Sequence, residues 1–353
     1  MTSLEPISDK LYHGKFTECG KVMDVLVKVT HTNSKAELEV NLYRKCAGIN
    51  GVLSLIYVEK QGTSMFLAFP YCESIVTLDQ ILKSELTDQE RFIYIKNLIK
   101  IVVRCYANGL SLGDIGLNNF LVYPDFESQT KTTLKMLLCD LDNVNKGNYT
   151  NSNEFPLCEI TICKTLMQLI NPTCNLYPST KLHYEYGVYE HLMIQMTKEP
   201  MPCNTVTKHP FFWAPSRTVN FFHQVHEFHC YKSGDQRMEN VMKDVQGRKQ
   251  SIIGCDNWIR ELKRSKLDHA LYNAFSFGNG YDGNDIKDLI RYLRNCIGHY
   301  NQKPPKAKKA LKPIPEGLLN RMLEPFPKLF VEMYNAIERE YGKKFECDFL
   351  DYV

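Results

Sequence analysis

The chain has 353 residues, 44% of them hydrophobic, and a net charge of +3. This length favours two domains over one, and so small a charge does not by itself indicate a nucleic-acid-binding protein. The 13 cysteines show no paired spacing, the N-terminus is not typical of a signal peptide, and no apolar run reaches about 18 residues, so we expect a reduced, cytoplasmic protein without a membrane span.

The first 72 residues alternate short apolar runs with polar breaks. The runs at 22–29, 51–58 and 64–69 are typical of strands, whereas residues 35–46 have apolar side chains at helical spacing. Strands around a single helix predict a small α+β lobe.

From residue 73 to residue 213 the pattern becomes mainly helical. Residues 92–109 have helical apolar spacing and end at Gly109, a common helix stop. Residues 160–170 are apolar almost all round and predict a buried helix.

After residue 213 nearly the whole sequence is typical of helices. Residues 286–300 and 326–341 are both amphipathic, and a Lys/Pro-rich segment at 301–315 between them predicts a loop. The last helix should bury one apolar face, made of Leu329, Phe330, Met333, Tyr334 and Ile337.

The predicted helix 286–300 has two different faces. Helical spacing places five aliphatic side chains on one side: Ile286, Leu289, Ile290, Leu293 and Ile297. It places polar side chains on the other side, with Arg294 next to them: Asp288, Arg291, Asn295 and His299. One helix can therefore contribute to the core and also present polar groups to a ligand.

This set of side chains suits RNA cleavage without a metal, in which the neighbouring 2′-hydroxyl is the nucleophile. Such a reaction needs a group that removes the hydroxyl proton, a cation that stabilises the phosphorane, and an acid that protonates the leaving oxygen. Histidine exchanges protons near neutral pH, arginine binds phosphate with two N–H groups, and a tyrosine hydroxyl can donate or accept a hydrogen bond.

Two motifs in order, HPFFW at 209–213 and RNCIGHY at 294–300, resemble the kinase-extension-nuclease family. That family includes ribonuclease L and the inositol-requiring kinase–endoribonuclease, and the resemblance covers nearly the whole chain. It implies an α+β fold with a two-lobed protein-kinase-like domain at 1–72 and 73–213, followed by an all-helical nuclease domain at 214–353. It also implies an RNA substrate and a homodimer.

The resemblance assigns roles residue by residue. His299 would be the general acid, Arg294 the phosphate clamp, Asn295 the group that orients the phosphate, and Tyr281 the base or a ligand of the 2′-hydroxyl. Asp288 and Trp258 would support the fold or the dimer. Cleavage itself would need no cofactor. A lone histidine near a helix end is usually structural or merely exposed, so a degenerate site that keeps these residues without activity is the alternative.

Kinase-like features precede the nuclease segment. Lys28 matches the strand lysine of kinases, Glu39 its helix partner, Asp114 and Asn119 the catalytic-loop pair, and Asp140 the Asp of D-F-G. These groups would hold ATP or ADP with Mg²⁺, here as an allosteric ligand. Single matches of this kind are also compatible with ordinary surface charges.

Several departures argue against protein phosphorylation. Leu112 and Gly113 replace the His-Arg of the catalytic loop, and the pair Gly14 and Gly20 is a poor phosphate loop. The segment after Asp142 is too short for an activation segment and lacks A-P-E. We therefore expect a nucleotide-responsive dimerisation scaffold, a pseudokinase.

Two further segments each allow two interpretations. The run with Lys303, Lys306, Lys308 and Lys309 is either a solvated, flexible segment or an arm that contacts RNA phosphates. HQVHEFHC at 223–230 is better interpreted as a polar helix face than as a metal site.

The whole-chain alternatives are a ribonuclease activated by dimerisation and a catalytically inactive scaffold, with an active protein kinase a distant third. No ankyrin repeats are present in the chain, so oligoadenylate sensing is not expected.

Overall fold

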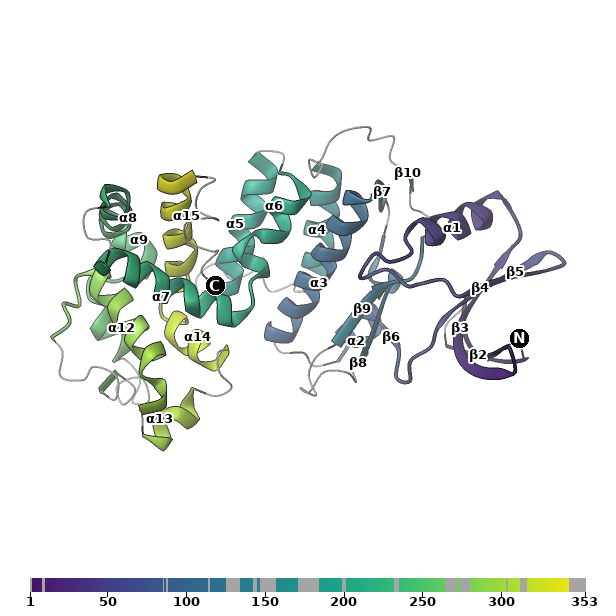
Figure 1. The fold of residues 1–353 in the computed structure, drawn as a ribbon, viewed down its shortest axis with the longest axis horizontal. Coiled ribbons are helices and arrows are strands. Elements are labelled where there is room, and N and C mark those ends of the chain that lie inside the picture. Colours follow the sequence, from purple (N-terminus) through teal and green to yellow (C-terminus); the bar gives the residue numbers. More distant parts are fainter. Residues whose placement is uncertain are drawn as a thin grey trace. The chain divides into compact units, whose positions relative to one another are not determined.

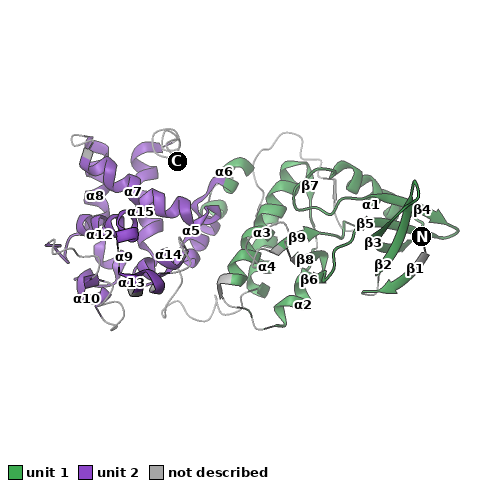
Figure 2. Ribbon diagram, turned by 60° about the horizontal axis from the view of Figure 1, so that its bottom comes forward, with its two compact units in different colours: residues 1–176, 195–207 green, residues 177–194, 208–353 purple. Residues whose placement is uncertain are grey.

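The computed structural model separates by packing into two compact units, residues 1–176 with 195–207 and residues 177–194 with 208–353 (Figure 2). It describes residues 2–7, 10–84, 86, 88–113, 115–124, 134–141, 145–146, 157–170, 184–198, 201–231, 235–263, 272–273, 280–302, 304–311 and 316–342. The boundaries after residues 72 and 213 expected from the sequence stay predictions.

The first unit begins with a five-stranded antiparallel sheet of order β1-β2-β3-β5-β4 (Figure 1). The strands are β1 (Thr2–Pro6), β2 (Leu11–Glu18), β3 (Lys21–His31), β4 (Tyr57–Gln61) and β5 (Ser64–Pro70). Central β3 is apolar, and its residues Val25 to Val27 are fully buried. Helix α1 (Ser34–Lys45) begins after Asn33, whose side chain accepts a hydrogen bond from the Ala36 N–H.

The strands predicted at 22–29 and 64–69 are confirmed, but the one at 51–58 is wrong over most of its length. Only its last two residues belong to β4. The apolar part before them packs instead: the Leu53 N–H donates to the Leu138 carbonyl at 2.9 Å, and a Cβ on Gly51 would lie 2.5 Å from Ile101. Val52 and Leu53 are buried and form only an isolated bridge to Leu138, whereas Ile56 is exposed. The sequence reading also missed β1 and β2.

The rest of the first unit contains two small sheets, β6-β8-β9 and β7-β10, beside helices α3 (Asp88–Ala107) and α4 (Leu157–Ile170), which pack together. Its other elements are β6 (Val76–Thr77), α2 (Leu78–Leu82), β7 (Leu110–Ser111), the 3-10 turn η1 (Leu117–Asn119), β8 (Phe120–Pro124), β9 (Leu134–Leu138), β10 (Asn145–Lys146) and α6 (Cys203–Lys208). Helix α3 stops before Gly109, as predicted. Helix α4 is amphipathic rather than buried all round, since Leu169 is 53% exposed.

The second unit is helical throughout its described part. Helix α15 packs on α8, and α12 packs on α7. Its elements are α5 (Tyr184–Lys198, mostly in this unit), η3 (Pro210–Phe212), α7 (Pro215–Tyr231), α8 (Gln236–Gly247), α9 (Lys249–Ile253), α10 (Trp258–Leu262), α12 (Ile286–Gly298), η4 (Tyr300–Gln302), α13 (Pro305–Ala310), α14 (Glu316–Leu323) and α15 (Leu329–Tyr341).

The five residues proposed for the inner face of the last helix are all buried. The 301–315 loop prediction is wrong in part: prolines at its start are compatible with a first helical turn, and α13 begins at Pro305.

An aromatic cluster explains the HPFFW motif. The Trp213 ring lies 5.8 Å, centroid to centroid, from each of three rings: Phe221, Phe330 and Tyr334. Its Nε1 donates to the Lys208 carbonyl at 2.9 Å. The motif therefore joins α7 to α15 in the core of the second unit, a structural role. Among the described helices, none combines the length and apolarity needed to cross a membrane.

The buried His209 gives a testable pH dependence of stability. Its Nε2 lies 3.0 Å from the His191 Nδ1, and its Nδ1 accepts from the Phe211 N–H. Burial, followed by repulsion from His191, lowers the pKa of His209 well below its usual value. The folded protein therefore keeps this ring neutral where the unfolded chain, below a pH of about 6.5, has already bound a proton.

We accordingly expect the free energy of unfolding to fall as the pH drops below about 6.5, by at most about 1.4 kcal/mol per pH unit from this group. Urea unfolding at a series of pH values measures this dependence of the free energy of unfolding on pH. His209→Asn keeps an acceptor for the Phe211 N–H but cannot titrate. Its free energy of unfolding should therefore change less steeply with pH, by the contribution of up to one bound proton. Equal slopes in both proteins would contradict the assignment.

Candidate functional site

Helix α12 holds two of the four predicted nuclease residues, Arg294 and Asn295, and a third, His299, is its C-terminal cap. It begins after Asp285, whose side chain accepts from the Lys287 N–H at 2.8 Å, and it ends at His299. Of its predicted apolar face, Ile286, Leu289, Ile290 and Leu293 are buried. Because this face is fixed in the core, the opposite face has a fixed direction.

A hydrogen-bonded chain links three predicted site residues. The Asn295 Nδ2 donates to the Tyr281 hydroxyl at 2.9 Å, and the Asn295 Oδ1 accepts from the Arg294 Nη1 at 3.2 Å. Tyr281 and Asn295 are each 9% exposed. The amide of Asn295 therefore orients both the phenol and the guanidinium.

A carboxylate that the sequence analysis missed lies beside this chain. Glu227 on α7 accepts from the Arg294 Nη2 at 3.1 Å, and the two side chains are each 26% exposed. Only tertiary packing of α7 on α12 brings them together, because they are 67 residues apart. No local spacing in the sequence indicates such a pair.

His299 lies at the C-terminal cap of α12, one helical turn after Asn295, to whose carbonyl its N–H donates at 3.1 Å. The His299 Nδ1 lies 3.2 Å from the Gln302 Oε1. An acceptor at Nδ1 favours the tautomer with its proton there. The catalytic roles of these four residues stay predictions.

The two predicted supporting residues hold the segment that carries Tyr281. Trp258 is fully buried, and its Nε1 donates to the Asp282 and Asp285 carbonyls at 3.1 and 3.0 Å. Asp288 accepts from the Asp282 N–H at 2.6 Å and pairs with Arg291 at 3.1 Å. The Arg291 guanidinium in turn lies 4.8 Å from the Tyr281 ring centroid. The supporting role of Trp258 and Asp288 stays a prediction.

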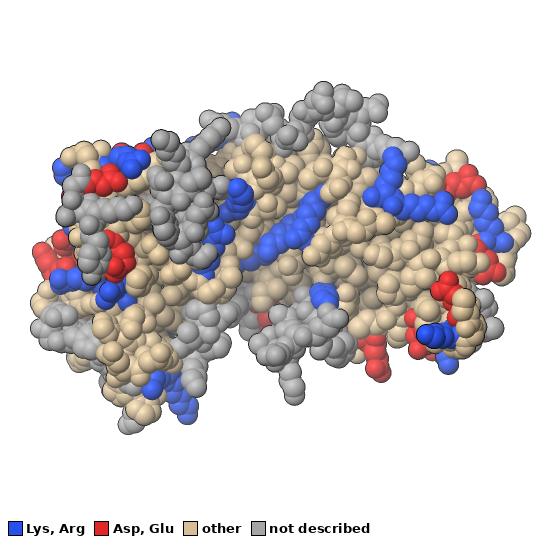
Figure 3. Space-filling view, viewed as in Figure 1, with Lys and Arg blue, Asp and Glu red and all other residues tan. Residues whose placement is uncertain are grey.

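The lysine run after His299 is only partly described. Lys309 is exposed and Lys308 half-buried on α13, whereas Lys303 and the side chain of Lys306 lie outside the described residues. On the face shown in Figure 3, basic side chains of the described residues form short, separate groups among neutral surface. An RNA-contacting role for this run stays a prediction.

The histidine-rich segment lies on α7 next to the site. The Cys230 Sγ is 3.6 Å from the His226 Nε2, and the His229 Nδ1 is 3.5 Å from Glu239. Burial, then the nearby Arg294 charge, lowers the pKa of His226. Among the described residues, no three metal-ligating side chains come together.

The kinase-like part contains an ion triad in which Lys28 and Glu39 are buried and Asp140 is half-buried. The Lys28 Nζ lies 2.7 Å from a carboxylate oxygen of Glu39 and 2.7 Å from one of Asp140. Burial opposes the charged amine, but the two carboxylates outweigh it and raise the pKa of Lys28. Burial also raises the pKa of Glu39, against the opposing effect of Lys28. Three residues predicted for nucleotide binding therefore meet.

The other groups of a kinase site fit less well. The Asn119 Oδ1 accepts from the Gly116 N–H at 2.6 Å, so a potential magnesium ligand is engaged in its own turn. Where kinases have a phosphate loop, β2 and β3 pair as far as Glu18 and Lys21. A two-residue turn, Cys19 and Gly20, joins them with positive φ angles at both positions, which leaves no open loop. Asp114 lies outside the described residues.

A buried carboxylate that the sequence analysis missed anchors the segment before Asp114. Glu159 on α4 accepts from the Ser111 Oγ at 2.7 Å and from the Leu112 N–H at 3.2 Å. Burial raises the pKa of Glu159. The catalytic-loop region thus keeps structural support despite the loss of His-Arg.

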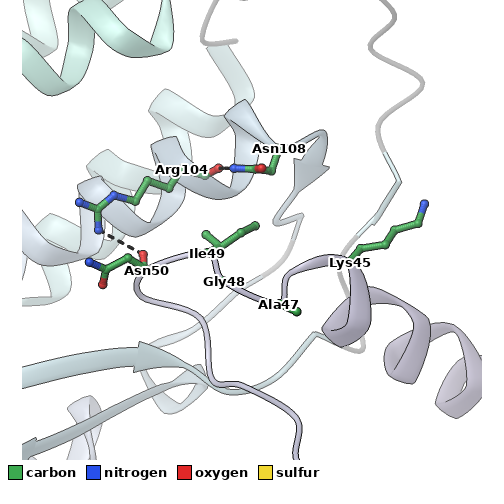
Figure 4. A pocket seen from close by; sticks show the side chains of 7 residues that line it. All are labelled: Lys45, Ala47, Gly48, Ile49, Asn50, Arg104 and Asn108. Atoms are coloured by element: carbon green, nitrogen blue, oxygen red, sulfur yellow. Dashed lines mark hydrogen bonds between the residues drawn. The ribbon is translucent and has the colours of Figure 1, made fainter.

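A separate pocket of about 390 Å³ lies between the end of α1 and the end of α3 (Figure 4). The Arg104 Nη1 donates to the Asn50 carbonyl at 3.1 Å, and the Lys45 side chain points away from that of Arg104. None of the Lys28 triad lines it. It is not the predicted nucleotide pocket, and its two cations do not converge on one ligand.

Comparison with known proteins supports the helical unit as a nuclease domain. Residues 218–350 match the sequence profile of the family described as Ribonuclease 2-5A. The sensor for unfolded proteins in the ER ire1 of Schizosaccharomyces pombe is 26% identical over 151 residues, which are 43% of this chain and 13% of that protein.

Two further relatives carry kinase and endoribonuclease names. The human serine/threonine-protein kinase/endoribonuclease IRE2 is 25% identical over 146 residues, 41% of this chain and 15% of that protein. The rice serine/threonine-protein kinase/endoribonuclease IRE1 is 28% identical over 133 residues, 37% of this chain and 14% of that protein. The matched regions are thus less than a fifth of these relatives.

The matched segment includes α7, α12 and α15, together with the site built on them. Residues 218–350 are a domain of the kinase-extension nuclease family. The expected fold class is confirmed: an antiparallel sheet lobe of kinase-like type and its helices, then an all-helical nuclease region.

The ion triad predicts a large effect on stability. Replacing Lys28 by Met leaves the buried Glu39 carboxylate and the half-buried Asp140 carboxylate without their cation, and breaking a buried pair such as Lys28–Glu39 costs about 3 to 5 kcal/mol. Urea unfolding should show this loss at pH about 8 and less of it near pH 5, where the carboxylates can bind protons. The control is Lys60→Met, whose partner Glu37 and own side chain are both exposed; it should change stability by under about 1 kcal/mol. Equal effects of the two substitutions would contradict the triad.

Proposed function

We propose that the protein is a metal-independent endoribonuclease. The observation that supports this most is the hydrogen-bonded chain from Tyr281 through Asn295 to Arg294, on the helix that ends at His299. A phenol, an oriented guanidinium and an imidazole are the groups that cleavage through a 2′-hydroxyl requires. The endoribonuclease names of the relatives point the same way.

In the proposed reaction the 2′-oxygen attacks the adjacent phosphorus while the bond from phosphorus to the 5′-oxygen breaks. The Tyr281 hydroxyl, already oriented by Asn295, binds or deprotonates the 2′-hydroxyl. The Arg294 guanidinium stabilises the charge on the phosphorane oxygens. His299, in its protonated form, gives a proton to the leaving 5′-oxygen. The products are a 2′,3′-cyclic phosphate and a 5′-hydroxyl.

We further propose that the kinase-like part binds ATP or ADP without transferring phosphate, and that the active form is a homodimer. Lys28, fixed by Glu39, can contact nucleotide phosphates, and Asp140 can hold Mg²⁺. The engaged Asn119 and the closed hairpin turn at Gly20 fit phosphotransfer poorly. The cytoplasmic location expected from the sequence stays a prediction.

Incubation of the full chain with a stem-loop RNA in EDTA tests the nuclease proposal. We expect cleavage to 2′,3′-cyclic phosphate ends, and no cleavage where the scissile nucleotide lacks its 2′-hydroxyl. Arg294→Ala and His299→Ala should each lower kcat by about 100-fold or more. Arg339→Ala and His31→Ala remove the same residue types at exposed positions and should cleave normally.

Two results would separate the alternatives. Intact RNA at high protein concentration, with ATP or ADP present, would overturn the nuclease and leave the inactive scaffold. Cleavage that persists in His299→Ala would show that a different group protonates the leaving oxygen.

A further inference from the structure

We propose that Glu227 is a positioning residue of the nuclease site, which holds the Arg294 guanidinium in the orientation that binds the scissile phosphate. This inference rests on the proposed function and deepens it. Glu227 is not among the residues that the family resemblance assigned to the site, and it lies on α7 rather than on the helix that carries the other groups.

The contacts of Arg294 show what Glu227 restrains. A guanidinium has five N–H donors in one plane. Asn295 accepts one from Nη1, and Glu227 accepts one from Nη2. With an acceptor at each end of the fork, rotation of the guanidinium about its own axis is blocked. The contact to Glu227 is a single hydrogen bond, so other donors stay available for a phosphate.

One of those donors is buried without an acceptor in the described part of the chain. The Arg294 Nε is such an atom, and an unpaired buried donor in a native protein calls for an explanation, such as a role at a functional site. Phosphate oxygens bind arginine through two N–H groups at once. The arrangement therefore fits a guanidinium that is fixed on two sides and still has N–H groups to offer an anion.

The groups around the Glu227 carboxylate favour its hydrogen bond to Arg294. A second titratable group beside it is His226, whose Nδ1 lies 3.8 Å from the Glu227 carboxylate. Burial and the Arg294 charge disfavour protonation of that ring. Because α7 packs along α12, the carboxylate sits on a rigid element rather than on a loop.

The negative charge of Glu227 and its hydrogen bond to Arg294 should have opposite effects on the reaction. A carboxylate near a bound phosphate repels it and weakens binding, while its hydrogen bond to Arg294 improves the alignment of the transition state. The two effects separate in kinetics: loss of alignment lowers kcat, and loss of repulsion lowers KM. A merely structural residue would not produce this split.

Three variants of the full chain test the proposal with a stem-loop RNA. Glu227→Ala should lower kcat about tenfold, because a small displacement of a catalytic group is costly. Glu227→Gln keeps an oxygen acceptor without the charge, so it should recover most of kcat and lower KM several-fold. Glu340→Ala, an exposed acid bonded to Asn240, is the control and should match wild type.

A double-mutant cycle that measures RNA binding makes the test independent of turnover. With RNA that lacks the scissile 2′-hydroxyl, Glu227→Gln should bind several-fold more tightly than wild type, but not in an Arg294→Ala background. Non-additivity of that kind shows that Glu227 acts through Arg294. If wild type cleaves no RNA, the nuclease proposal fails, and this cycle still decides the role of Glu227.

Three outcomes would overturn the inference. The first is wild-type kcat in Glu227→Ala, and the second is a Glu227→Gln variant as impaired as Glu227→Ala. The third is additive effects on binding in the Arg294→Ala background. In each case the nuclease assignment would stand if wild type cleaves.

Discussion

The site depends on the fixed rotation of α12. Its aliphatic face is buried in the helical unit, so Arg294 and Asn295 cannot turn away without exposing that face. Fully burying one such side chain is worth about 1.5 to 3 kcal/mol, and four of them outweigh any single polar contact at the site. The hydrogen bonds to Tyr281 and Glu227 therefore refine an orientation that apolar packing has already set.

Polar contacts then fix the positions of the individual side chains at the site. Trp258 and Asp288 fix the segment of Tyr281 through hydrogen bonds to the backbone of Asp282, and the amide of Asn295 joins the phenol to the guanidinium. A second helix, α7, supplies the carboxylate opposite Arg294. The HPFFW motif at the start of α7 anchors that helix through the Trp213 cluster and so contributes to the site only indirectly.

Local sequence patterns predicted α12, α15 and the central strand β3 because each has one clear apolar period or run. They failed at 51–58, where the buried Val52 and Leu53 form only an isolated bridge instead of a strand, and at α13, where prolines begin a helix instead of preventing one. The conjunction of Tyr281 with Asn295 came from family resemblance. Glu227 and Glu159 could not be found in either way, because each meets its partner only through tertiary packing.

A structure of the protein with an RNA whose scissile 2′-hydroxyl is replaced by hydrogen is the most direct test of the proposed nuclease site. We expect one phosphate within hydrogen-bond distance of the Arg294 guanidinium, with the His299 ring near its 5′-oxygen and the Tyr281 hydroxyl near the 2′-position. A phosphate bound away from these three side chains, or Arg294 directed away from it, would contradict the proposed site.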